Sequence, residues 1–210
     1  MKYLKKQFKN LWDESDCIGN WRKFFSELEE DYSKPTRHYH TFEGHIAFCV
    51  RAFFDHAVEM VENPSGVLWQ LFLHDVVMDF QRSDNDARSA EYARDFLSRA
   101  GGSAKLINYV GEAIECHTHQ TVPESLDIAF GLDIDLFILA QSQEVFDEYE
   151  QNVKREYSFV KESFRRQRRA DILGGFLENR PSIFITKYFR NSFEETARRR
   201  LRDSIRKLRK

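Results

Sequence analysis

Apolar residues recur along most of the chain at intervals of three and four, the spacing that places them on one face of an α-helix. Proline is scarce, with four residues in a chain of 210. We therefore predict an all-α protein. The clearest example is one predicted helix face made by Ile46, Val50, Phe53, Ala57 and Val61.

Small, polar and helix-breaking residues predict where these helices begin and end. Asn63-Pro64 is expected to close the helix that contains residues 46–61, and Gly101-Gly102 a later one. Serine and aspartate side chains can cap helix starts, because their oxygens accept hydrogen bonds from free backbone N–H groups. The expected starts are Ser65, Ser83 or Asp84, and Ser103, and further helices are expected within residues 126–140, 144–177 and 192–210.

Length and composition favour one intracellular domain. Residues 1–210 can bury one core, with a central part at about 36–140 and C-terminal helices at about 141–210. The formal charge of -2 argues against electrostatic nucleic-acid binding by the whole chain. We expect a cytoplasmic protein with no membrane contact, since neither a signal-type apolar run nor an 18-residue apolar stretch occurs. Cys17, Cys49 and Cys116 are expected to be buried, reduced thiols.

Histidine and aspartate residues are distributed in a way that suggests a site. All seven histidines lie between His38 and His119, and three fall in "RHYHTFEGHI" at residues 37–46. An adjacent His74-Asp75 pair ends the apolar run "LFLHD", and Asp79 follows. A carboxylate beside buried leucines needs a compensating partner, because desolvating a lone charge costs several kcal/mol.

Two further acidic residues interrupt the apolar segment "IAFGLDIDLFILA". On a helix, Asp133 and Asp135 point about 200° apart, so only one of them can face a given ion. We choose Asp135 and keep Asp133 as the fallback. The alternative is that both carboxylates lie at a solvated helix edge.

Taken together, these motifs resemble a bacterial group of metal-dependent phosphohydrolases in the HD superfamily. The resemblance extends from Arg37 to about Arg198, and it implies an HD-domain-like helical bundle with additional C-terminal helices. It is the order of the motifs that is specific. That order is "RHYHTFEGHI", "LFLHDVVMD", "NDARSAEYA", "LDIDLFILA" and "YEQNVKREY".

The resemblance implies a ligand set of His74, Asp75, Asp135 and either His45 or His40. The first stretch is also similar to "YHNxxH" of cyclic-nucleotide phosphodiesterases, where the second histidine binds metal and the first donates a proton. Here the two histidines are five residues apart instead of four, because one residue is added near Gly44. We expect His45 to bind metal and His40 to act as the acid, with the reverse assignment as the alternative.

Two imidazoles and two carboxylates suit an octahedral divalent ion such as Mn²⁺, Fe²⁺, Co²⁺, Ni²⁺ or Mg²⁺. Such an ion turns bound water into a nucleophile and stabilises charge on a phosphate. His40 and Asp79 are placed to move protons, and Arg37 to hold a phosphate oxygen. The expected activity is hydrolysis of a phosphoester or phosphoanhydride bond in a small phosphorylated substrate such as a nucleotide.

His117 and His119 allow two interpretations: ligands of a second metal ion or of substrate, or histidines exposed at a helix end. Two other functions stay open for the chain. One is a non-catalytic HD-like module that senses a nucleotide. The other is an RNA-associated protein that binds RNA through the basic residues of its C-terminal helix. An apolar stripe on the same helix is expected to pack against the rest of the protein. That stripe consists of Ala197, Leu201, Ile205 and Leu208.

Overall fold

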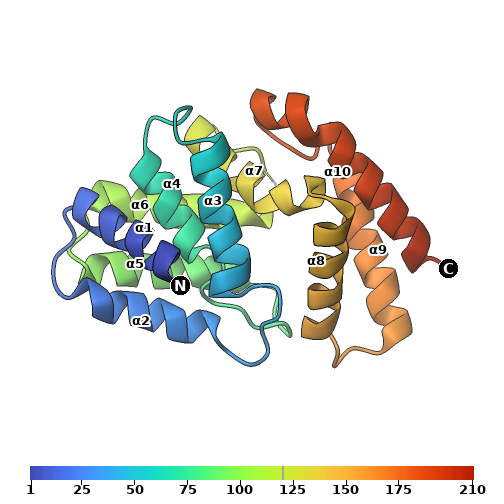
Figure 1. Cartoon of the computed structure of the whole chain (residues 1–210), viewed down its shortest axis with the longest axis horizontal. Helices are drawn as coiled ribbons and strands as arrows, with labels where there is room; N and C mark the ends of the chain where they lie inside the picture. The colour runs from blue at the N-terminus through green and yellow to red at the C-terminus, as the bar shows by residue number, and fades with distance from the viewer. Residues whose placement is uncertain (120) are drawn as a thin grey trace. The chain divides into compact units, whose positions relative to one another are not determined.

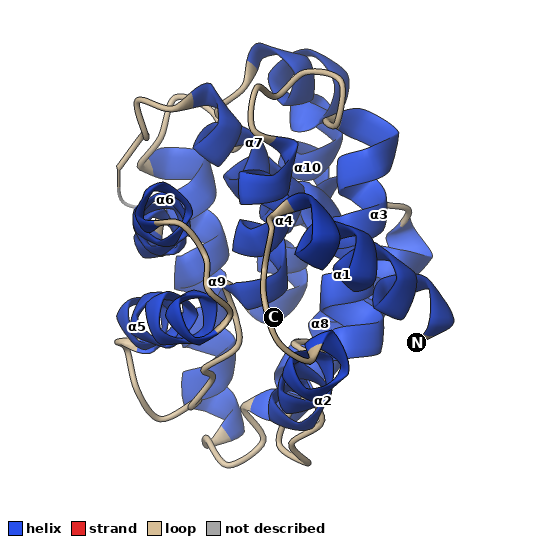
Figure 2. Ribbon diagram, turned by 90° about the vertical axis from the view of Figure 1, so that its left-hand side faces the viewer, coloured by secondary structure: helices blue, strands red, loops and turns tan. Residues whose placement is uncertain are grey.

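The computed structural model of the chain describes residues 1–119 and 121–210, and these residues form helices joined by turns and loops (Figures 1 and 2). The predicted all-α class is confirmed, since the described part of the chain contains no strand. The α-helices are α1 (Lys2–Glu14), α2 (Trp21–Tyr32), α3 (Ala47–His56), α4 (Pro64–Leu73), α5 (Asn85–Arg99), α6 (Ala104–Glu115), α7 (Leu126–Asp135), α8 (Gln143–Glu156), α9 (Glu162–Glu178) and α10 (Lys187–Leu208). Three short helices of other types are η1 (Phe42–Ile46), η2 (Cys116–Thr118) and η3 (Leu136–Ala140).

The helices divide into two compact units. Unit 1 spans Met1–Leu132 and unit 2 spans Asp133–Lys210, so the division falls within α7. The sequence-based expectation of one domain stays a prediction.

Helix α4 is the centre of unit 1. It contacts α1, α3, α5 and α6, and every residue from Gly66 to Leu73 is buried. The sequence accounts for this position, because "VLWQLFL" is apolar on all sides and a helix of that kind is stable only when it is surrounded. The end of α4 therefore lies inside the unit, and His74 follows directly.

Aromatic rings from several helices fill the core around α4. The ring of Phe8 in α1 meets those of Phe25, Trp69 and Phe72 edge-on, with centroids 5.4, 5.5 and 5.6 Å apart. Edge-to-face pairs of this kind add to the free energy gained from burial. They hold α1 between α2 and α4, the helix that ends directly before the His-Asp pair.

Two of the expected boundaries and one expectation about the cysteines need correction. Helix α3 ends at His56, before the expected closure at Asn63-Pro64. The N-cap of α4 is Asn63 and not Ser65. The side chain of Asn63 accepts a hydrogen bond from the backbone N–H of Gly66 at 3.0 Å. Pro64 occupies the first position of the helix, where its missing N–H costs nothing. Ser103 caps α6 as predicted. All three cysteines are free thiols, but only Cys49 is buried, while Cys17 and Cys116 are half-buried.

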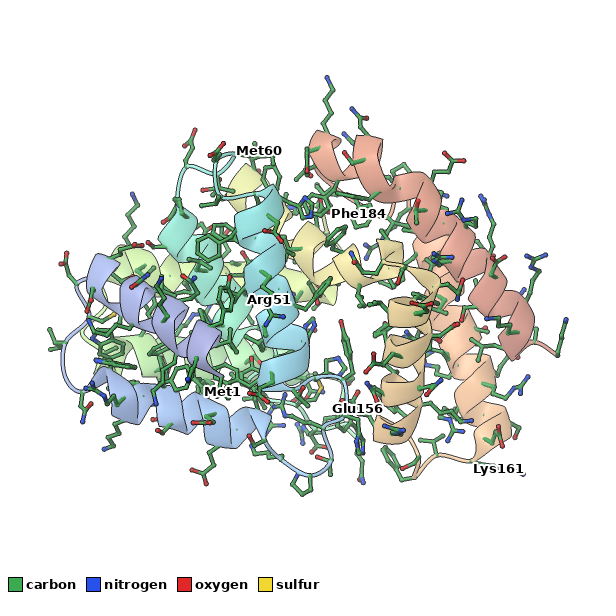
Figure 3. All side chains as sticks on the ribbon, in the orientation of Figure 1. Met1, Arg51, Met60, Glu156, Lys161 and Phe184 are labelled. Atoms are coloured by element: carbon green, nitrogen blue, oxygen red, sulfur yellow. The ribbon has the colours of Figure 1, made fainter. Side chains whose placement is uncertain are left out.

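Unit 2 is built from α8, α9 and α10. The expected helical run over 144–177 is divided by a turn at residues 157–161, which ends at Lys161 (Figure 3). Arg169 of α9 joins the helices: it donates hydrogen bonds to the hydroxyl of Tyr149 and to Glu150 of α8, and Glu150 accepts another from Ser204 of α10.

Helix α10 packs on α9 and on η3, and most of its predicted apolar stripe is buried. Ala197, Leu201 and Ile205 are buried, and Leu208 is half-buried. Across the described residues, no helix combines the length and the apolar character needed to cross a bilayer. The cytoplasmic location expected from the sequence stays a prediction.

Candidate metal centre

The end of α4 fixes the first two functional side chains. His74 caps the helix, and its Nδ1 lies 3.1 Å from the carbonyl oxygen of Leu71. A carbonyl only accepts, so Nδ1 carries the proton of the neutral ring and Nε2 keeps its lone pair. His74 is therefore held in the tautomer that a metal ligand requires, with Asp75 directly after it.

The third side chain comes from η1, a single turn of π-helix. The carbonyl of Thr41 accepts a hydrogen bond from the N–H of Ile46 at 3.2 Å, which spans five residues instead of four. The Thr41 hydroxyl also accepts from the N–H of Gly44 at 3.1 Å, and a Cβ at Gly44 would lie 2.7 Å from that hydroxyl. This turn therefore contains one residue more than an α-helical turn, and π-turns of this kind are common at functional sites.

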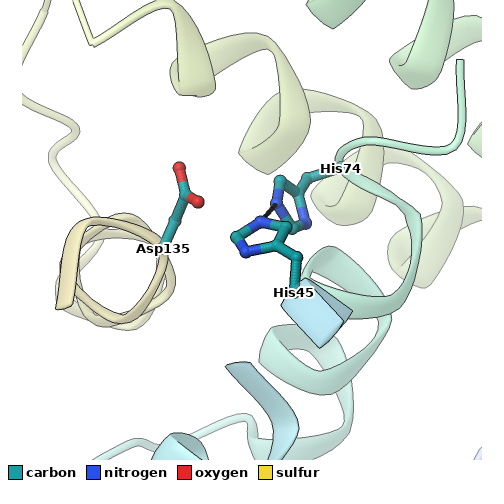
Figure 4. A group of neighbouring side chains, drawn as sticks. All are labelled: His45, His74 and Asp135. Atoms are coloured by element: carbon teal, nitrogen blue, oxygen red, sulfur yellow. Dashed lines mark hydrogen bonds between the residues drawn. The ribbon is translucent and has the colours of Figure 1, made fainter. Parts of the chain in front are cut away.

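Three potential ligand atoms of unit 1 converge at this point. The Nε2 atoms of His45 and His74 lie 2.9 Å apart (Figure 4, which also draws Asp135). Oδ2 of Asp75 lies 3.2 Å from each of them. Both imidazoles are buried, and the carboxylate is half-buried.

These distances match neighbouring ligands on one metal ion. For metal–ligand distances of about 2.1 Å, adjacent ligands of an octahedral ion lie about 3.0 Å apart, and those of a tetrahedral ion about 3.4 Å. The observed distances fit adjacent ligands of one ion: the 2.9 Å between His45 and His74 is closer to the octahedral value, and the two distances of 3.2 Å lie between the two values.

Proton counting also indicates a cation at this point. If both imidazole rings are neutral, only His45 can supply an N–H proton between the three atoms, because His74 donates its single ring proton to the carbonyl of Leu71. Nε2 of His74 and Oδ2 of Asp75 would then face each other with lone pairs at 3.2 Å. A proton on one imidazole or a bound metal ion removes this repulsion.

The charge state of Asp75 is suited to binding a cation. Burial raises the pKa of this carboxyl, but the charge of His74, hydrogen bonds from His45 and His74 and the charge of His40 together hold the pKa well below its usual range. The carboxylate is therefore ionised at neutral pH. Among the described residues, two groups of histidine and aspartate side chains that are buried or half-buried could hold a metal ion.

Arg37 joins the two segments that carry the ligands. Its guanidinium donates to the carbonyls of His40 at 3.0 Å, Asp75 at 2.8 Å and Val76 at 2.7 Å, and it lies over the ring of Tyr32. The residue is only 5% exposed. These contacts use three of the five N–H groups of Arg37 and favour a role in positioning the two segments. The expected binding of a phosphate oxygen by Arg37 stays a prediction.

The two residues expected to move protons lie in different surroundings. The half-buried ring of His40 is 5.8 Å from the ring of His45 and 4.8 Å from that of Tyr39, measured between centroids. Asp79 is exposed, and its carboxylate accepts a hydrogen bond from the N–H of Gln81 at 3.0 Å. His40 thus lies beside the three-atom cluster of His45, His74 and Asp75, whereas Asp79 lies at the surface.

The two aspartates of α7 have different environments. Asp133 is fully buried, and its two oxygens accept hydrogen bonds from the N–H groups of Ile185 and Thr186, both at 2.7 Å. Thr186 is the N-cap of α10, so Asp133 neutralises free donors at the start of that helix. Asp135 ends α7 and is half-buried. The segment is helical at both residues, as predicted.

His117 is part of the buried histidine group of unit 1. Its ring stacks on that of His74 with centroids 4.6 Å apart and planes at 24°. It is 7% exposed, so the alternative of a water-exposed histidine is wrong for this residue. His119 is half-buried with a positive φ of 53°.

Gln70, whose amide contacts His117, was not among the residues predicted from the sequence. Gln70 is the one polar residue in the apolar run "VLWQLFL", and that interruption is the signal that could have identified it.

Comparisons of the chain with protein-family models, with curated proteins and with solved structures returned no match.

Proposed function

We propose that the chain is a metal-dependent phosphohydrolase of the HD-superfamily type. The observation that carries this proposal is the convergence of His45, His74 and Asp75 at distances of 2.9 and 3.2 Å. Two imidazoles and a carboxylate on one face of an octahedron leave positions for further ligands, water and substrate. The proposed reaction is hydrolysis of a phosphoester or phosphoanhydride bond in a small phosphorylated substrate such as a nucleotide.

We propose Asp135 as the next ligand, in preference to Asp133. The reason is that both oxygens of Asp133 already accept backbone N–H groups at the start of α10. Moving that carboxylate toward an ion would leave two buried donors without a partner, which is costly. Asp135 is two residues further along the same helix and points to another side.

A bound divalent ion would supply a nucleophilic water and neutralise charge on the phosphate under attack. The chain's own residues divide the remaining work. His40, beside the cluster, protonates the leaving oxygen, and Arg37 holds the His40 segment to the turn after α4 through three carbonyls. Asp79, at the surface, exchanges protons with solvent.

The test is elemental analysis of the purified protein combined with a hydrolysis screen of nucleotides and phosphomonoesters. Wild type should bind Mn²⁺, Fe²⁺, Co²⁺ or Ni²⁺ and release phosphate or a nucleoside phosphate, whereas His74→Ala should lose both metal and activity. His56→Ala is the matched control, because His56 ends α3 outside the cluster. Full metal content in His74→Ala would contradict the proposal, and retained metal without turnover of any substrate would favour a nucleotide-sensing module.

A further inference from the structure

The start of α5 is attached to the loop that follows the three-atom cluster. The hydroxyl of Ser89 accepts a hydrogen bond from the backbone N–H of Val77 at 3.1 Å and donates one to the carbonyl of Val77 at 3.2 Å. The side-chain amide of Asn85 forms a similar pair with the backbone of Asp79, with both hydrogen bonds at 2.9 Å. Val77 is two residues after Asp75, and two residues of chain span at most about 7 Å. The first two turns of α5 therefore lie near the cluster.

Arg88 belongs to the face of α5 that meets this loop. Asn85, Arg88 and Ser89 are three and four residues apart, a spacing that places side chains on one side of a helix. Helix α5 also contacts η2, which carries His117, and the ring of His117 stacks on that of His74 with centroids 4.6 Å apart. The helix that carries Arg88 therefore contacts two segments that lie against the proposed metal ligands, namely the loop after Asp75 and η2.

One nitrogen of the Arg88 guanidinium has no partner. Its Nη1 is buried and has no hydrogen-bond partner among residues 1–119 and 121–210. Asp84, one turn earlier on the same helix face, is already paired, because Nε and Nη2 of Arg82 donate to its two oxygens at 2.7 and 2.5 Å. A buried donor of a charged group without an acceptor is unfavourable. The substrate-free position of Arg88 is therefore one from which an acceptor would draw it.

The side chain of Arg88 can reach such an acceptor. The residue is half-buried, so part of the side chain is open to solvent, and a change in its last torsions moves Nη1 toward the open side. Such a change gives up no hydrogen bond of Nη1, because Nη1 makes none within the described part of the chain. The gain on meeting an acceptor is correspondingly large.

Arg37 differs from Arg88 in this respect. Its Nη1 donates to the carbonyls of His40 and Asp75, and its Nη2 donates to the carbonyl of Val76. A phosphate oxygen at these nitrogens of Arg37 would have to replace buried backbone acceptors, which would then lose a donor. Guanidinium groups bind phosphate through charge-assisted hydrogen bonds, and Nη1 of Arg88 has a donor to give.

We propose that Arg88 binds a phosphate group of the substrate. The inference rests on the proposed function, because the proposed substrate supplies the acceptor that Nη1 lacks. In the bound state the guanidinium donates to phosphate oxygens and fixes the orientation of the substrate relative to the metal ligands. Arg88 is thus a substrate-binding residue, and Arg37 keeps the role of holding the His40 segment to the turn after α4.

Removal of the guanidinium should have opposite effects on stability and on phosphate binding. Arg88→Met keeps an apolar stem and removes the unpaired donor, so without phosphate its Tm should equal or exceed that of wild type. In Mn²⁺-loaded protein freed of excess metal, calorimetry should show that its affinity for inorganic phosphate is lower by about tenfold or more, since charge-assisted hydrogen bonds are lost. Arg88→Lys, which keeps the charge, should lose less affinity than Arg88→Met.

The matched control is Arg82→Gln, since Arg82 is exposed and already paired with Asp84. It should change phosphate affinity less than about twofold. A structural arginine would give a lower Tm in phosphate-free Arg88→Met, and a trapped water at Nη1 would give equal phosphate affinity in wild type and variant. Either result, or a wild type that binds no phosphate, overturns the inference.

Metal content separates this inference from the proposed function. Arg88→Met should keep the metal content of wild type, because Arg88 is not among the proposed ligands. A metal-loaded wild type whose phosphate affinity does not depend on Arg88 would overturn the inference and leave the proposed function. A wild type that binds no metal, yet binds phosphate through Arg88, would overturn the proposed function and leave the phosphate-binding role of Arg88.

Discussion

Replacing Asp75 by asparagine separates metal binding from folding at the three-atom cluster. Asparagine has the shape of aspartate, and its NH₂ group can donate to the lone pair on Nε2 of His74, 3.2 Å away. The metal-free variant should therefore keep its helices and lose none of its packing. It should bind metal far more weakly, because a neutral amide replaces one of the three converging ligands.

The size of the effect follows from linkage between binding and unfolding. A ligand present at 100 times its dissociation constant stabilises the native state by about 2.7 kcal/mol. For a chain of 210 residues, each kcal/mol raises Tm by about 2–4 °C, so saturation with Mn²⁺ should raise the wild-type Tm by about 5–11 °C. For Asp75→Asn under the same conditions we expect a rise of less than about 1 °C.

Thermal unfolding followed by circular dichroism at 222 nm, with and without Mn²⁺, measures both quantities in one experiment. Asp79→Asn is the matched control, because Asp79 is an exposed carboxylate four residues further on and should leave the Mn²⁺-dependent rise intact. A rise in Asp75→Asn equal to that of wild type would show that the ion binds elsewhere.

Three further predictions concern neighbouring parts of the site. Asp135→Asn should lose metal while its free energy of unfolding stays unchanged. Asp133→Asn should keep metal, but its free energy of unfolding, measured in urea, should fall by about 1–3 kcal/mol because two buried hydrogen bonds are weakened. Equal metal loss in both variants would contradict this assignment. His40→Ala should keep metal and lower turnover by about 10² to 10⁴, less for nitrophenyl esters, whose leaving group needs no proton; a metal-free His40→Ala protein beside a loaded His45→Ala protein would exchange the two roles. Gly44→Ala should destabilise the protein by about 1–3 kcal/mol, since the added methyl group would lie 2.7 Å from a threonine hydroxyl. At Gly175 in α9 the added methyl group would lie 3.6 Å from its nearest neighbour. Gly175→Ala should therefore stabilise the protein by about 0.5–1 kcal/mol, because alanine favours the helix over glycine.

The elements that sequence reasoning identified are those with a strong local signal. The all-α class and the end of α4 at His74 follow from apolar periodicity and from an apolar run that stops at a polar pair. Helix α1 was not predicted, although Leu4, Phe8 and Leu11 recur at helical spacing among charged residues. The cap of α4 was misplaced by two residues because serine and asparagine cap equally well, and only the chain path selects Asn63.

The site required information that no local pattern contains. Asp133 accepts a hydrogen bond from the N–H of Thr186 at the start of α10, and these two residues are 53 positions apart in the sequence. The burial of Gln70 against Gly131, which is 61 residues further along, likewise depends on how α4 and α7 pack. The tautomer of His74 depends on a carbonyl three residues earlier, which becomes visible only when the end of the helix is known.

The π-turn at Phe42–Ile46 also makes this site sensitive to chain length. Deleting one residue there would convert the turn into an ordinary α-helical one, and the segment before it would rotate by about 100° relative to α3. His40 would turn with that segment, while His45 would stay with the helix that follows. A single inserted residue therefore sets the angle between the histidine proposed to donate a proton and the histidine proposed to bind metal.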